Sequence, residues 1–181
     1  LEKLPLYHGL RFEESWLSGN RTPEQLASFT SKIRNELPAE TYLELSEWYE
    51  RTGCTEEAIA LLTCAGNHPI ALYQKAWLLN RQGAEQESRE TLIQANAQSP
   101  DYIFPFRPET MKYLDWAESQ SANWKINYYQ GLIYWTNQQK DKALQKMNLC
   151  ENSGYAPLYL SRAQLKEGEA RLADLIKAEQ A

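Results

Sequence analysis

The chain has 181 residues, of which 43% are hydrophobic and 24% are charged, and its formal net charge is −5. This composition supports one compact domain or a short array of repeats. Nucleic acid is not expected as a partner, because affinity for phosphate polymers comes mainly from clustered Lys and Arg. Membrane insertion is not expected either, since the sequence contains no run of about 18 apolar residues.

The chain begins at Leu1 without a methionine or a charged-then-apolar leader, which indicates a mature piece or an excised part of a longer protein. The chain has three cysteines, Cys54, Cys64 and Cys150. Because this number is small and odd, a disulfide framework is not expected. They slightly favour the cytoplasm as a reducing compartment. Many periplasmic proteins also lack disulfides, so the compartment stays open.

The helical periodicity of the apolar residues, together with the prolines, glycines and capping residues between them, predicts about eleven helices. Thr22 is expected to cap the second helix, with Pro23 at its first position and Gln25 reaching back as in a capping box. Gly53 and Gly83 are expected in turns where a positive φ is needed. The predicted helices span 5–18, 23–36, 39–52, 55–66, 69–82, 84–97, 108–119, 124–137, 139–151, 157–167 and 169–179.

Three stretches of the chain share one pattern of small and large residues. When Ala39, Pro69 and Trp124 are taken as first positions, small residues recur at the eighth and twentieth positions. The eighth are Ser46, Ala76 and Gly131, and the twentieth are Ala58, Ser88 and Ala143. Small residues there allow antiparallel helices to approach closely. The pattern is typical of tetratricopeptide repeats, in which each helical hairpin buries its apolar face against its neighbours.

The sequence therefore predicts an all-α fold, a tetratricopeptide-like right-handed superhelix of about eleven helices with one irregular Pro/Phe-rich loop. We expect a single domain over 1–181. Its parts are an opening hairpin at 1–37, repeats at 38–68 and 69–100, an inserted loop and helix at 101–121, a repeat at 122–154 and a terminal hairpin at 155–181.

The inserted loop breaks the repeat period. Pro100, Pro105 and Pro108 exclude a continuous helix and favour a stiff, extended segment. The loop also carries four large apolar residues: Tyr102, Ile103, Phe104 and Phe106. We expect it to fold back onto the helices and to cover these side chains.

Four strings resemble a recurrent bacterial module. They are IRNELPAETYLEL at 33–45, FPFRPET at 104–110, Trp124-Lys125 with Tyr128-Tyr129, and APLYLSRA at 156–163. The module is the tetratricopeptide region of large bacterial proteins that carry an upstream β-sandwich domain of unknown function, similar to sugar-mutarotase and β-galactosidase sandwiches. The resemblance covers nearly the whole chain. It implies the helical fold, a bacterial source and a link to carbohydrate metabolism, but no activity. Before His8 the family tends to have an asparagine, and this chain has Tyr7.

No constellation of residues indicates catalysis or a bound cofactor. Cys64 and His68 are four residues apart, but a zinc site needs three or four converging ligands. The sequence contains no nucleophile elbow, phosphate-cradling glycine loop or HExxH pattern. We therefore expect a protein that is not an enzyme, with no metal and no cofactor.

The concave face of the array is the predicted binding surface. In tetratricopeptide arrays it is lined mainly by positions two, five, nine, twelve and thirteen of each first helix. Together with Arg107 of the loop, these positions and their register give Arg51, Tyr73, Trp77, Asn80, Arg81, Lys125, Tyr128 and Trp135 as candidates. Tyr, Trp and Arg are enriched at binding hot spots. Two alternatives stay open: Trp77 and Trp135 are buried by the next hairpin or the loop, and Arg107 pins its own loop.

The leading functional prediction is a non-catalytic protein-interaction scaffold. It would bind a peptide segment or an adjacent domain through the concave face, and the upstream domain of the same polypeptide is one candidate partner. The alternative is an accessory carbohydrate-recognition or sugar-processing module of a larger protein. A third hypothesis is self-association through a terminal hairpin.

Overall fold

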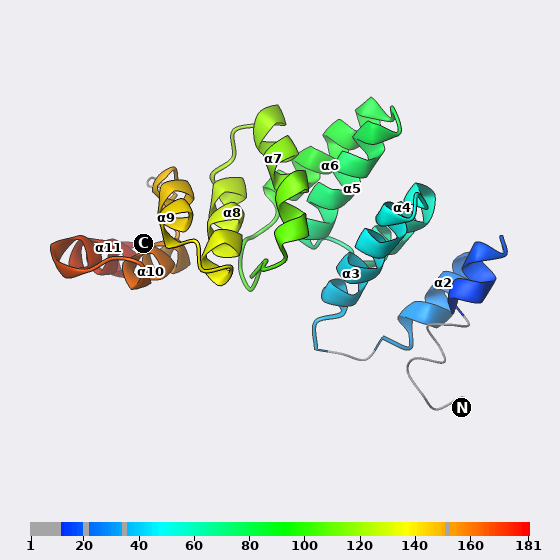
Figure 1. Ribbon diagram of the computed structural model, residues 1–181, viewed down its shortest axis with the longest axis horizontal. Helices are drawn as coiled ribbons and strands as arrows, with labels where there is room; N and C mark the ends of the chain where they lie inside the picture. Colours follow the sequence, from blue (N-terminus) through cyan, green and yellow to red (C-terminus); the bar gives the residue numbers. More distant parts are fainter. Residues whose placement is uncertain (1–11, 20–21, 34–35, 151–152) are drawn as a thin grey trace. The chain divides into compact units, whose positions relative to one another are not determined.

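The computed structural model describes residues 12–19, 22–33, 36–150 and 153–181 of the chain. Over these residues the protein is entirely helical, without a strand (Figure 1). They comprise ten α-helices, α2 to α11, and one 3₁₀ helix, η1. A further helical segment at 12–17 precedes α2. The predicted all-α, tetratricopeptide-like fold is confirmed.

The chain divides into two compact units, Leu1–Ala71 and Leu72–Ala181. The boundary falls inside α5, after its third residue, Ala71. The continuity of one repeat array across this boundary stays a prediction.

The first unit contains the helical segment 12–17 and helices α2 (Pro23–Thr30), α3 (Pro38–Arg51) and α4 (Thr55–Cys64). Thr22 caps α2 as predicted, because its hydroxyl accepts the Gln25 backbone N–H at 3.3 Å. The Gln25 side chain accepts a hydrogen bond from Ser15. Phe12 stacks on Phe29 with ring centroids 4.0 Å apart, which joins the first helical segment to α2.

Helix α2 ends at Thr30, six residues before the predicted end at 36. The Thr30 hydroxyl donates to the Ala27 carbonyl at 2.9 Å, and the Ser31 hydroxyl donates to the Ser28 carbonyl at 2.8 Å. Hydroxyls that bond locally to carbonyls compete with the helical ladder. The predicted boundary was wrong because it followed apolar periodicity and ignored this competition.

Helices α3 and α4 form the first regular hairpin. Gly53 has φ of 84° in the connecting turn, and the Cys54 N–H reaches back to the Tyr49 carbonyl at 2.8 Å. A positive φ of this kind is the αL conformation that ends many helices. Ser46 and Ala58 are fully buried in this hairpin, as the repeat pattern predicts.

The second unit contains most of α5 (Pro69–Arg81) and all later elements (Figure 1). These are α6 (Glu85–Ala97), η1 (Pro108–Thr110), α7 (Met111–Gln120), α8 (Trp124–Thr136), α9 (Lys140–Asn148), α10 (Ala156–Gln164) and α11 (Gly168–Gln180). Helices α5 and α6 lie within the range 69–100, and α8 and α9 lie within the range 122–154; the assignment of these ranges as two repeats stays a prediction.

The small residues of the repeat pattern are where the helices of the second unit touch. The Ser88 hydroxyl donates to the Ala76 carbonyl at 2.7 Å, so α6 meets the backbone of α5 directly. A methyl group added to Gly131 would lie 2.7 Å from Cγ of Met147, which leaves no room for any side chain between α8 and α9. Close packing at these positions is what defines a tetratricopeptide-like hairpin.

The prediction that the inserted loop buries its large apolar residues was wrong. Tyr102 is 89% exposed, Phe104 66% and Phe106 45%, whereas Pro105 is buried and Ile103 is half-buried. The segment 103–107 lies outside the helices. Side chains of an extended chain alternate between its two faces, so only every second one can point inward.

Candidate functional site

Two of the predicted groove residues, Tyr73 and Tyr128, lie in the interior of the second unit. Tyr73 is 0% exposed, and its hydroxyl donates to Oδ1 of Asn96 at 2.8 Å. Tyr128 is 1% exposed and packs edge-on against Tyr155 at 5.6 Å between centroids. Burial raises the pKa of both phenols. These tyrosines therefore join helices together and present no ring face to a ligand.

Lys125 holds the start of α8 against the end of α6. Its ammonium donates to the backbone carbonyls of Asn96 at 2.9 Å and Gln98 at 2.5 Å. The last carbonyls of a helix have no partner within the helix, and a cation there also matches the helix dipole. Burial lowers the pKa of Lys125. The side chain acts as a cap for α6.

The remaining candidates outside α5 are distributed over separate elements. Arg51 lies in the first unit, exposed on α3, where its Nε donates to Glu47 at 3.0 Å. Arg107 lies with its guanidinium carbon 4.5 Å above the Phe106 ring. Trp135 is half-buried on α8. The contact between Arg107 and Phe106 agrees with the alternative in which Arg107 pins its own loop.

Three predicted residues, Trp77, Asn80 and Arg81, do lie together, on the last turn and a half of α5. The Trp77 ring packs edge-on against Tyr113 of α7 at 5.1 Å between centroids. The guanidinium carbon of Arg81 lies 4.7 Å from the centre of the Trp77 ring, and Nζ of Lys112 lies 5.4 Å from it. Two cations flanking one indole gain cation–π stabilisation. The surface is thus formed jointly by a repeat helix and the inserted helix.

Next to this cluster the second unit has a pocket of about 420 Å³ between α6 and α7. Its wall combines the indole of Trp116, the exposed side chain of Ile93 and several polar groups. The polar lining includes Asn80, Arg89, Asn96 and Gln120. This volume lies within the range of small-molecule and side-chain binding sites, about 300–1,000 Å³. Asn80 belongs both to the predicted groove and to the pocket.

The sequence did not identify the pocket, because α7 has no counterpart in the repeat. Trp116 is therefore not among the residues that the repeat register selects. One signal was present: Lys112, Trp116 and Gln120 follow each other at four-residue spacing, which places them on one face of α7.

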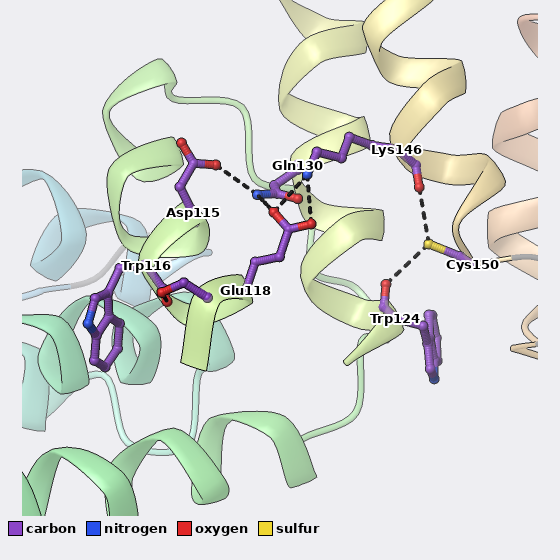
Figure 2. A network of polar contacts seen from close by, with 8 residues as sticks. Asp115, Trp116, Glu118, Trp124, Gln130, Lys146 and Cys150 are labelled. Atoms are coloured by element: carbon purple, nitrogen blue, oxygen red, sulfur yellow. Dashed lines mark hydrogen bonds and ion pairs between the residues drawn. The ribbon is translucent and has the colours of Figure 1, made fainter. Parts of the chain in front are cut away.

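A polar network on the opposite side of α7 fixes the position of Trp116 (Figure 2). Nε2 of Gln130, on α8, donates to Asp115 at 2.8 Å and to Glu118 at 3.0 Å. Lys146 of α9 donates to both oxygens of Glu118, at 2.8 and 2.7 Å. Figure 2 shows the Trp116 indole pointing away from this network.

The network keeps Glu118 ionised. Burial by itself raises the pKa of this carboxyl, but the hydrogen bonds from Lys146 and Gln130 outweigh that effect, so the pKa is lowered. The resulting charged contacts tie α7 to α8 and α9 together. One face of α7 is therefore used for attachment, and the other lines the pocket.

No known family description and no curated protein sequence matches the chain. Among the solved structures that the chain matches are two of MamA. "MamA RS-1 ArsTM double mutant" is 16% identical, with 78% of this chain and 93% of that chain covered and a TM-score of 0.39. "MamA 41-end from Desulfovibrio magneticus RS-1" is 18% identical, with 78% and 89% covered and a TM-score of 0.32. The resemblance to the module with an upstream β-sandwich domain stays a prediction.

The described part of the chain contains no group of three or more His, Cys, Asp or Glu that could hold a metal ion. Cys64 and His68, the pair considered from the sequence, are both half-buried. The Cys64 thiol donates to the Ala60 carbonyl, and burial lowers the pKa of His68. Within the same residues, no helix has the length and apolar character to cross a bilayer.

Proposed function

We propose that the chain is a protein-interaction scaffold that binds an extended peptide segment across the α5–α7 surface. This surface comprises Trp77, Asn80 and Arg81 of α5, Arg89 and Ile93 of α6, and Trp116 and Gln120 of α7. The observation that carries the proposal is the pocket of about 420 Å³ with Trp116 in its wall, directly beside the exposed Asn80.

The chemistry of the surface suits a peptide. Carboxamides such as Asn80 and Gln120 offer both a donor and an acceptor, which matches the N–H and C=O groups of an extended backbone. Trp116 and Ile93 offer apolar area for one anchoring side chain. The stacked Arg81 on Trp77 adds a planar cation at the rim. A peptide with one large apolar residue flanked by polar ones fits this arrangement best.

A segment or domain of the same polypeptide is the partner that we favour. The resemblance of this chain to a module with an upstream β-sandwich domain supports this choice. A tethered partner has an effective concentration in the millimolar range for a short flexible linker, so a modest intrinsic affinity is enough.

The test uses peptides selected from a random phage-displayed library on the full 181-residue chain. Affinity of the selected peptides is then measured by isothermal titration against Trp116→Ala, Asn80→Ala and the unchanged chain. We expect each substitution to weaken binding by about tenfold or more. Trp48→Ala is the matched control, because Trp48 is a 61% exposed tryptophan on α3, in the other unit. Selected peptides that bind all variants equally would refute the proposal.

The choice of partner is tested separately. It predicts that the gene encodes a β-sandwich domain upstream of Leu1, and that domain is then used in a pull-down. We expect capture by the unchanged chain and loss of capture by the double variant Trp77→Ala/Arg81→Ala. Peptide binding without capture of that domain would leave the surface assignment intact and reject only this choice of partner.

Carbohydrate recognition is the second candidate, favoured by the composition of the same pocket. An indole face with Asn80, Gln120 and Arg89 around it offers stacking and planar hydrogen-bonding groups for a sugar ring. Titration of simple galactosides and oligosaccharides, followed by tryptophan fluorescence, tests this function. If a sugar quenches the tryptophan fluorescence saturably, and the quenching is lost in Trp116→Phe, the pocket is a sugar-binding site and not a peptide-binding site.

A further inference from the structure

Helix α11 carries three large apolar side chains that the described residues leave substantially exposed. Leu172 is 57% exposed, Leu175 39% and Ile176 45%. Positions separated by three and four residues lie on one face of a helix, so these three side chains form a continuous patch. Figure 1 shows α11 beside α10, as the last helix of the second unit.

The orientation of this stripe is fixed by the opposite side of α11. Asp174 is only 2% exposed and binds Arg162 of α10 in a buried ion pair, with Oδ2 2.8 Å from Nε. Lys166 also contacts Asp174, at 2.9 Å. Because this polar anchor faces α10, the leucine stripe faces away from it.

The charges that flank the stripe are arranged symmetrically about Leu175. Arg171 lies four residues before Leu175, and Glu179 lies four residues after it, and both are exposed. In two antiparallel copies of α11 that cross at Leu175, Arg171 of each copy lies beside Glu179 of the other. Two copies of this one helix therefore form two opposite-charge pairs and one central contact between their Leu175 side chains.

We propose that α11 is a homodimer interface, in which a second copy of this chain covers Leu172, Leu175 and Ile176. A two-fold interface uses the same patch on both subunits, so the patch must be complementary to itself. The arginine–leucine–glutamate order of α11 has this property. The proposal does not depend on the peptide-binding function, since it concerns a different helix.

The expected dimer is weak. A helix of 13 residues is about 20 Å long, and two such helices bury less than the standard interface of about 1,600 Å². We expect a dissociation constant on the order of micromolar to tens of micromolar. At low concentration the protein is therefore a monomer of 21.0 kDa, and at high concentration its mass rises toward twice that value.

Sedimentation equilibrium of the full chain over a wide concentration range tests the interface. Leu175→Asp is expected to keep the mass monomeric throughout, because it places two carboxylates together at the centre. Arg171→Glu and Glu179→Arg are each expected to weaken the dimer by about tenfold or more, since each replaces two attractions by two repulsions. The double variant Arg171→Glu/Glu179→Arg is expected to restore the original affinity.

Two controls separate the interface from folding and from general charge effects. Circular dichroism and thermal melting of each variant at low concentration check that the helices persist. Lys140→Glu reverses an exposed lysine at the start of α9, and we expect it to leave the mass unchanged. A chain that is monomeric at every concentration, a dimer that survives Leu175→Asp, or a double variant that fails to recover would each overturn the proposal.

Discussion

Arg162 of α10 and Asp174 of α11 form a bidentate ion pair in the interior of the terminal hairpin. Nε donates to Oδ2 at 2.8 Å and Nη2 donates to Oδ1 at 2.5 Å, and both side chains are no more than 3% exposed. A buried charge that loses its partner is far more costly than an exposed one. The pair therefore determines how α10 and α11 fit together.

Asp174→Asn is expected to lower the free energy of unfolding by about 3–5 kcal/mol, because it leaves the Arg162 guanidinium buried without a counter-charge. Urea titration at neutral pH, followed by circular dichroism, measures the change. Glu169→Gln removes an exposed carboxylate from the same helix and is expected to change stability by no more than about 0.5 kcal/mol. Equal effects of the two substitutions would contradict the role of the pair.

The same carboxylate predicts a loss of stability in acid. Burial by itself raises the pKa of Asp174, but the hydrogen bonds from Arg162 and Lys166 outweigh it, so the pKa in the folded state is lowered. Such a group contributes its full stabilisation above its unfolded pKa of about 3.9 and loses it as the pH falls through the folded value. Unfolding free energies measured below about pH 4 should fall more steeply in the unchanged chain than in Asp174→Asn.

Gly131→Ala tests the close contact between α8 and α9. Alanine gains about 1 kcal/mol of helix propensity over glycine. Its methyl group, however, would lie 2.7 Å from Cγ of Met147, and overpacking of this kind costs about 1–3 kcal/mol. We expect a net loss of about 1 kcal/mol in urea unfolding. In a Met147→Ala background the added methyl group should instead stabilise, because it fills part of the cavity.

Gln138 stands where the other two hairpins have glycine. Its φ is 61°, and the turn has the same hydrogen bond as the others, from the Gln139 N–H to the Tyr134 carbonyl at 2.9 Å. A side chain in this left-handed conformation costs about 1–2 kcal/mol. Gln138→Gly is therefore expected to raise the unfolding free energy by about 0.5–1 kcal/mol, after the entropy cost of glycine.

The matched control for this turn is Gly83→Ala. Gly83 has φ of 81°, and open space surrounds the position of an added Cβ, so only the backbone conformation opposes the substitution. We expect a loss of about 1 kcal/mol. A neutral Gly83→Ala together with a neutral Gln138→Gly would show that these turns tolerate side chains.

The hairpins could be predicted from the sequence because their pattern is local. Ser46, Ala76 and Gly131 are small for one shared reason, the approach of a second helix, and each is buried as expected. The register of the binding face could not be predicted in the same way. It assumes that each repeat stacks on the next, whereas the inserted α7 packs on α5 through Trp77 and Tyr113.

The insertion of α7 explains why Lys125 and Trp116 have other surroundings than the repeat register predicts. With α7 in place, the end of α6 meets the start of α8, and Lys125 serves as a cap there. Trp116 of α7 lines a pocket that the repeat pattern does not predict, because α7 lies outside that pattern. Exposure in the loop had a different cause: an extended backbone must turn every second side chain outward, so Phe104 could not be buried together with Pro105.

Cys150 is expected to react last of the three thiols. It is 1% exposed, its Sγ lies 3.2 Å from the Trp124 carbonyl, and burial raises its pKa to about 12. The thiolate is the reactive form, and at pH 8 only about one thiol in 10,000 is ionised at that pKa. Timed alkylation with iodoacetamide and mass spectrometry should therefore modify the half-buried Cys54 at least about a hundredfold faster. In denaturant the rates should converge, because the difference comes from the burial of Cys150 just after the end of α9 and from its contact with α8. Equal rates in the native protein would mean that α9 opens readily, and the packing of Gly131 on Met147 would then be looser than the contact distances indicate.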